Sequence, residues 1–161
     1  MSDDRFVEVS SYSKESYGIG ATTRQGMLNY GYALMIIAGG DGEVSEAEMN
    51  WLINNQKKFG VPEDIIETYH HYDYKNGDLE SLLPDIVVDI DNWEAKPNLL
   101  YHAIQMCSAD GVYADEERAK VLEGAKLLKV SDEILLTIHA LIEMENAVTK
   151  MRKAIFNVKT L

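Results

Sequence analysis

Residues 38–48 read Ala-Gly-Gly-Asp-Gly-Glu-Val-Ser-Glu-Ala-Glu, and residues 107–117 read Cys-Ser-Ala-Asp-Gly-Val-Tyr-Ala-Asp-Glu-Glu. The two stretches align without a gap when the sequence is shifted by 69 residues, and the register continues as far as Ile66 and Leu135. Each copy is predicted to form a helix, an acidic loop, a helix, a short break and a further helix. Because one copy alone would leave its apolar face in water, we expect the two to pack face to face about a pseudo-twofold axis.

The rest of the pattern is also helical. From Arg24 onward, apolar residues recur at spacings of three and four. Ser45 and Glu48 form a capping-box signature, and Gly60 is placed to end the helix that they begin. Further helices are predicted over 62–73, 79–91, 97–109, 115–128 and 132–145, and the last of these can continue to Val158. We therefore predict an all-α, single-domain bundle of about seven to eight helices.

The two ends of the chain differ from the repeat. Residues 1–23 are rich in Ser, Thr, Tyr and Gly and show no clear period, so they are predicted to form an irregular N-terminal arm. The helical domain is predicted over residues 24–145. Residues 146–161 include four Lys or Arg and no acid, and we expect them to form a basic helix that packs on the domain and buries Ile155.

Composition favours some partners over others. The 161 residues include 27 acids and 15 bases, which gives a net charge of −12. Such a surface repels nucleic acid and anionic lipid, and it suits divalent cations or a basic protein partner. The longest apolar stretch is far shorter than the ~20 residues of a membrane span. The single cysteine and the absence of a secretory signal favour a cytoplasmic location, and a homodimer is compatible with the sequence.

No pattern in the sequence indicates catalysis. We find no nucleophile with a base and an orienting group, and no glycine loop that would cradle a phosphate. His102, within an apolar helical segment, is interpreted as a satisfied, partly buried residue rather than a ligand. We therefore expect no enzyme activity and no organic cofactor.

Both acidic loops share the pattern Asp-Gly-x-x-x-x-x-Glu, which resembles the second half of an EF-hand loop. Asp41 would take position 5, Glu43 the backbone-carbonyl position 7, and Glu48 the bidentate position 12. Ile37 and Gly39 would fall at positions 1 and 3, where they supply no carboxylate, so a regular EF-hand is excluded. What remains is a half-site, which water or the facing loop would have to complete.

These residues are our candidate metal ligands. The ligands predicted for a divalent cation are Asp41, Glu43, Glu48, Asp110 and Glu117. Oxygen ligands favour Ca²⁺ or Mg²⁺ over Zn²⁺ or Mn²⁺. A purely structural reading stays open, because Asp-Gly is a common turn and Ser-x-x-Glu caps a helix without any metal. In that case the chain would be a metal-free interaction or scaffold module that docks a basic protein through its acidic face.

The paired loops, the helical surround and the acidic charge together resemble the TerB family of tellurite-resistance proteins. The resemblance covers about residues 24–145 and rests on the stretches 40–48 and 109–117. It implies an all-helical fold with internal twofold symmetry and acidic clusters that bind metal ions. It also implies a role in tellurite resistance or a related stress response. Ala114 departs from the family, which has Ser or Thr at that place in the loop.

Overall fold

The structure is a computed structural model that describes residues 5–40, 42–109 and 115–160. The elements follow one another as β1 (Phe6–Glu8), α1 (Ser11–Tyr17), β2 (Ala21–Thr23), α2 (Arg24–Ala38), α3 (Glu46–Lys58), α4 (Glu63–Tyr69), η1 (Tyr74–Asn76), α5 (Leu79–Leu82), η2 (Leu83–Asp85), α6 (Ala95–Cys107), α7 (Asp115–Leu127) and α8 (Asp132–Phe156). The η elements are 3₁₀ helices. The predicted all-α fold is confirmed, with one small antiparallel sheet of β1 and β2 added to it.

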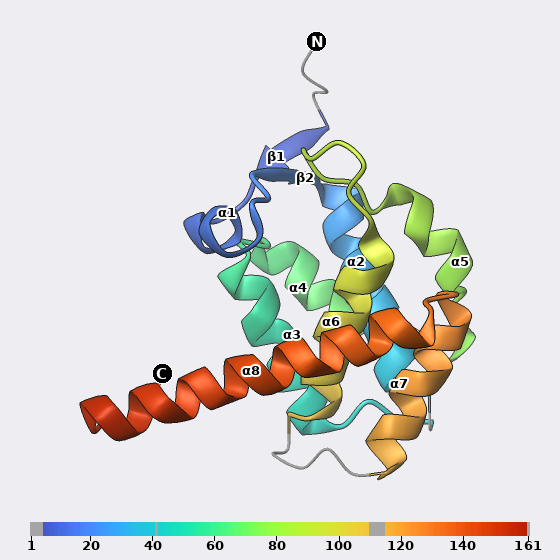
Figure 1. Cartoon of the computed structure of the whole chain (residues 1–161). Coiled ribbons are helices and arrows are strands. Elements are labelled where there is room, and N and C mark those ends of the chain that lie inside the picture. The colour runs from blue at the N-terminus through green and yellow to red at the C-terminus, as the bar shows by residue number, and fades with distance from the viewer. Residues whose placement is uncertain (1–4, 41, 110–114, 161) are drawn as a thin grey trace.

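The internal repeat organises the bundle (Figure 1). Helices α2, α3 and α4 form the first copy, and α6, α7 and α8 the second. Within the copies, α2 packs on α3 and α4 just as α6 packs on α7 and α8. Between the copies, α2 packs on α6, α3 on α6, and α7 on α2. Each of these contacts among the six helices therefore has its counterpart under exchange of the copies, which is the predicted pseudo-twofold arrangement.

The core lies where α2 and α6 meet. Leu34 of α2 and Leu99 of α6 are fully buried there, and Leu52 and Val121 join them from α3 and α7. Both copies therefore supply one shared core, as expected for units that cannot bury an apolar face alone. Among the described residues, no helix combines the length and apolar character that crossing a bilayer requires.

The start and the end of α3 are formed by the residues that the sequence predicted. Ser45 and Glu48 form a reciprocal capping box at the start of α3. Gly60 follows α3 with a φ of 87°, in the left-handed region. The equivalent position in the second copy is Lys129, which adopts a φ of 56°. At Gly60 a Cβ atom would lie 2.9 Å from the backbone nitrogen of Ser10, because the N-terminal segment crosses the helix end there.

The prediction of an irregular arm over residues 1–23 was wrong for the part that the structure describes. Strand β1 pairs antiparallel with β2, and α1 lies between them with Ser10 as its N-cap. The Ser10 N–H donates to the carbonyl of Phe59 at 3.0 Å, which ties the arm to the end of α3. Strands of three residues are too short for an alternating pattern to be recognised in the sequence.

Two predicted helices are shorter than expected. The helix predicted over 62–73 ends at Tyr69, whose buried hydroxyl donates to the carbonyl of Met27 at 2.8 Å. The helix predicted over 79–91 ends at Asp85, as α5 and η2. Pro84 lies in η2, and beyond it Val88 forms an isolated bridge with Thr22 of β2. Pairing with the small sheet therefore replaces the expected last turns.

The prediction that residues 146–161 pack back on the domain was also wrong. Helix α8 runs without a break from Asp132 to Phe156, and its C-terminal end projects beyond the body of the molecule (Figure 1). Ile155, expected to be buried, is 69% exposed. No glycine or proline interrupts the sequence between the Ser131 N-cap and Asn157, so nothing turns the helix back.

Candidate functional site

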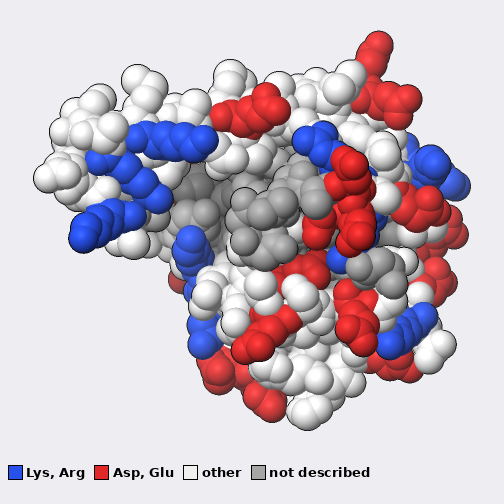
Figure 2. Space-filling view, turned by 90° about the horizontal axis from the view of Figure 1, so that it is seen from below, with Lys and Arg blue, Asp and Glu red and all other residues white. Residues whose placement is uncertain are grey.

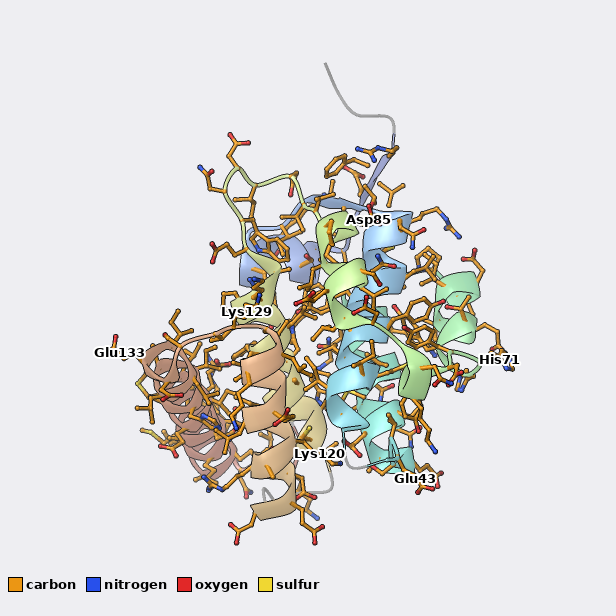
Figure 3. All side chains as sticks on the ribbon, turned by 90° about the vertical axis from the view of Figure 1, so that its right-hand side faces the viewer. Glu43, His71, Asp85, Lys120, Lys129 and Glu133 are labelled. Atoms are coloured by element: carbon orange, nitrogen blue, oxygen red, sulfur yellow. The ribbon has the colours of Figure 1, made fainter. Side chains whose placement is uncertain are left out.

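The fold brings the start of α3, which follows the first acidic loop, close to α7, which follows the second. In the contacts between the copies, α3 packs on α6 and α7 packs on α2. Figure 3 shows Glu43, just before α3, and Lys120, in α7, at the same end of the molecule. An ion pair between Glu48 of α3 and Lys120 of α7 joins the two copies directly. Residues 110–114 of the second loop lie outside the described residues, so the expectation that the two loops are neighbours stays a prediction.

Glu48 is the best-defined member of the site. Its Oε1 atom accepts a hydrogen bond from the Ser45 N–H at 3.0 Å, while the Glu48 N–H donates to Ser45 Oγ at 3.1 Å. The Lys120 ammonium lies 3.6 Å from the same Oε1 atom, and both side chains are 7% exposed. The second oxygen, Oε2, is buried and accepts no hydrogen bond from any described residue. One face of this carboxylate is therefore occupied, and the other has no protein partner in the described chain.

Glu117 is the counterpart of Glu48 in the second copy. It lies in the first turn of α7, three residues before Lys120, so both side chains lie on one face of that helix. Its Oε2 atom is also buried and without a hydrogen-bond partner among the described residues. A buried carboxylate oxygen without a donor loses its hydration and gains nothing in return. Such an oxygen in each copy is a feature that the capping box alone does not explain.

The other candidate ligands are either exposed or outside the described residues. Asp41 and Asp110 lie outside the described residues. Glu43 is exposed and does not join the buried carboxylates, while the next residue, Val44, is held by a hydrogen bond of 3.1 Å from its N–H to the Tyr74 hydroxyl. Within residues 5–40, 42–109 and 115–160, no three His, Cys, Asp or Glu side chains gather closely enough to hold a metal ion. Glu48 and Glu117 would thus need further oxygens from the loops or from water.

Sequence reasoning missed Lys120. It aligns with Trp51 under the 69-residue shift, so the repeat gives no hint of a buried cation there. The only available signal was its spacing of three from Glu117 within a helix whose apolar residues, such as Val121, face the core.

A further buried polar group lies within α6. His102 is fully buried, its Nδ1 atom is hydrogen-bonded to the Tyr30 hydroxyl, and its Nε2 atom lies 3.2 Å from the Tyr17 hydroxyl. Burial lowers the pKa of His102 to about 4, so the ring stays neutral near pH 7. Both ring nitrogens have partners, which confirms the interpretation of His102 as a satisfied residue. Rings of Phe59 and Tyr101 complete an aromatic cage around it.

A groove lies beside α8, which packs on α6. Trp51 of α3, Gln105 of α6 and Arg118 of α7 line its floor, and His139 and Asn146 of α8 line its wall. Because its wall is the inner face of α8, the groove is a consequence of how far that helix extends.

Comparison with known proteins identifies the fold. No protein-family model and no curated protein matches the sequence. Among solved structures, a tellurite resistance protein from Nostoc punctiforme is similar at a TM-score of 0.80, with 23% sequence identity and 99% of each chain covered. The similarity extends over the whole chain, including the N-terminal arm and α8. The chain therefore has the fold of that tellurite resistance protein, and the TerB-like fold predicted from the sequence is confirmed.

Proposed function

We propose that the protein is a TerB-like acidic helical protein that binds a divalent cation where the first turns of α3 and α7 meet, with a role in tellurite resistance or a related stress response. The observation that carries the proposal is the pair of buried carboxylate oxygens, one on Glu48 and one on Glu117, that accept no hydrogen bond within the described chain. The description of the similar solved structure as a tellurite resistance protein supports the biological part.

The donor set favours a hard cation. Carboxylate oxygens suit Ca²⁺ and Mg²⁺, which require six to eight and six ligands respectively. In the proposed site Glu48 offers Oε2, Glu117 offers its equivalent, and Asp41 and Asp110 add carboxylates from the loops. Water would fill the remaining positions, which predicts modest affinity rather than the tight binding of a complete EF-hand.

Lys120 has a defined part in this proposal. Its ammonium neutralises Glu48 when no metal is bound, and it thereby makes burial of the carboxylate tolerable. An incoming divalent cation would be repelled by this charge, so binding depends on the added negative charge of the loop aspartates. The charge of Lys120 therefore lowers the affinity for a cation, and the loop aspartates must outweigh it.

Calorimetric titration of the metal-free protein with Ca²⁺, Mg²⁺, Mn²⁺ and Zn²⁺ tests the proposal. The variant carrying Asp41→Asn and Glu48→Gln should lose the binding heat, and so should Glu117→Gln. Gln at position 48 still completes the capping box, but it leaves the buried Lys120 without its counter-charge, so thermal unfolding must first show that the variant is folded. Glu43→Gln, at an exposed carboxylate beside the site, is the matched control and should bind nearly as the wild type does. Binding that survives both the double variant and Glu117→Gln would refute the site.

The alternative is a metal-free scaffold that docks a basic protein. One observation favours it: the capping box and Lys120 together account for Oε1 of Glu48 without any metal. The net charge of −12 supplies the attraction for a basic partner. An absence of heat with all four metals, together with salt-sensitive binding of a Lys-rich peptide, would support this alternative over the cation site.

A further inference from the structure

Helix α8 carries apolar residues on its solvent side. Leu141, Met144, Val148, Met151 and Ile155, which we call the outer seam, follow one another at intervals of three, four, three and four residues. This is the spacing of the a and d positions of a coiled coil. All five belong to one uninterrupted helix of 25 residues. A seam of this kind normally faces another helix.

The outer seam has no partner within the described chain. Its members are 44%, 62%, 49%, 61% and 69% exposed, in sequence order. The residues that attach α8 to the body, Leu135 and Ile138, are buried on the opposite side of the helix, where α8 packs on α6. Helix α8 is therefore apolar on two sides, and only the inner one is used by its own molecule.

The position of the seam leaves room for a partner. The seam reaches into the part of α8 that projects beyond the body (Figure 1). A helix laid along it would meet the outer side of α8, while the body of each molecule stays on the inner side. Two copies could then pair through their α8 helices with the two bodies on opposite sides of the pair.

The distribution of charged residues along α8 indicates both the partner and the direction in which it would pair. The first half of α8 contains Asp132, Glu133, Glu143 and Glu145 and no Lys or Arg, whereas residues 150–153 contain three bases and no acid. Figure 2 shows the basic side chains gathered on the projecting end, away from the acidic surface of the body. An antiparallel second copy of α8 brings Glu143 and Glu145 near residues 150–153 of the other copy, whereas a parallel copy sets like against like.

We propose that two copies of the protein associate through the outer seams of α8, paired antiparallel about a twofold axis that passes between Val148 and Met151. In this register Val148 packs beside Met151 of the second copy, and Met144 beside Ile155. Glu145, on the flank of the seam, then lies near Arg152 of the second copy. The interface is self-complementary, as a twofold dimer requires.

The mass in solution tests the association. Size-exclusion chromatography with light scattering should give twice the chain mass of 18.1 kDa, falling towards the single mass on dilution. Ile155→Glu places a carboxylate in the seam and should weaken the dimer on the order of a hundredfold. Leu136→Glu is the matched control, because Leu136 is equally exposed at 69%, lies on the same helix and is outside the seam. A chain that stays monomeric at every concentration, or two variants that behave alike, would overturn the proposal.

Cross-linking tests the direction. In the antiparallel register the two Met144 positions are about 16 Å apart, since eleven helical residues separate each from the position facing it. A chain carrying both Met144→Cys and Ile155→Cys should therefore form a covalent dimer on oxidation, while each single variant should not. The natural Cys107 is buried and should not interfere. Cross-linking of the single variants would show a parallel pair and refute the antiparallel arrangement.

Reversal of charge tests the pairing of the flanks. Glu145→Arg alone and Arg152→Glu alone should each weaken the dimer, because each places like charges together. The double variant should recover most of the loss. A basic amphipathic helix can instead lie on an anionic membrane. A wild-type chain that remains monomeric but binds phosphatidylserine vesicles, with loss of binding on Ile155→Glu, would overturn the dimer in favour of that role.

Discussion

At the scale of single residues, the pair of Glu48 and Lys120 couples stability to the proposed cation. Without metal, Lys120→Met should destabilise the fold by about 3 kcal/mol, because it leaves the carboxylate of Glu48 buried without a counter-charge. The same change should tighten cation binding at least tenfold, since two unit charges about 4 Å apart interact by about 4 kcal/mol at an effective dielectric of about 20.

Thermal unfolding with and without Ca²⁺, together with calorimetry, measures both effects of Lys120→Met. Lys126→Met removes an exposed lysine from the same helix and should change neither stability nor affinity noticeably. Unaltered affinity in Lys120→Met would place the cation away from Glu48.

His102 should make stability depend on pH. Its pKa is lowered to about 4 in the folded protein and is about 6.5 in the unfolded chain, so the unfolded chain binds one more proton between these values. This contribution to stability is complete above pH 6.5 and is lost as the pH falls towards 4. The total amounts to roughly 3 kcal/mol. Denaturant unfolding at pH 5 and pH 7 should show the loss, and His102→Phe, though less stable at pH 7, should show a smaller difference between the two. An equal difference would contradict burial of a neutral ring.

The sequence predicted part of the candidate site and missed part for a physical reason. Glu48 was identifiable because capping boxes and acidic loops have local patterns. Lys120 was not, because its role depends on contact between two helices that are far apart in the sequence. A buried lysine is rare unless it is paired, and only the fold supplies the pair.

At the scale of elements, one glycine lets α4 lie against α2. A Cβ atom on Gly31 would lie 2.3 Å from the ring of Tyr69. Alanine favours a helix by about 1 kcal/mol over glycine, but here the clash should outweigh that gain and give a net loss of about 1–3 kcal/mol. Chemical denaturation of Gly31→Ala measures the change. In a Tyr69→Ala background the same substitution should become neutral or stabilising, and an equal loss there would show that the ring is not the cause.

The elements that were predicted well are those with local signals. The start of α3 is fixed by its capping box and its end by Gly60, and both were identified. Strands β1 and β2 were missed because three residues are too few to show an alternating pattern, and β2 pairs with Val88 from a distant part of the chain. The C-terminal segment was predicted to turn back because its basic side chains would be attracted to the acidic body. No residue interrupts the helix, however, so α8 continues in one direction away from the body.

At the scale of the whole molecule, the projecting end of α8 should contribute little to the stability of one copy. Deletion of residues 149–161 should leave the melting temperature of dilute, monomeric protein nearly unchanged, because the removed side chains are largely exposed. The same deletion should abolish the dimer, since it removes Met151 and Ile155 from the seam. Differential scanning calorimetry and light scattering separate the two effects. A clear drop in the monomer's melting temperature would show that the segment does dock on the body.

Residues 60 and 129, which follow α3 and α7, both adopt a left-handed backbone conformation. They should nevertheless differ in which substitutions they tolerate. Gly60 has both a positive φ and the N-terminal arm pressed against it, so a side chain there meets two obstacles. Lys129 has the same backbone shape but is exposed. Lys129→Gly should therefore stabilise the protein by about 1 kcal/mol, whereas Gly60→Lys should cost more than the backbone strain alone. Urea unfolding of the two variants compares them, and a symmetrical outcome would contradict this view. The N-terminal arm therefore restricts substitution after α3, whereas the equivalent position after α7 can accept other residues.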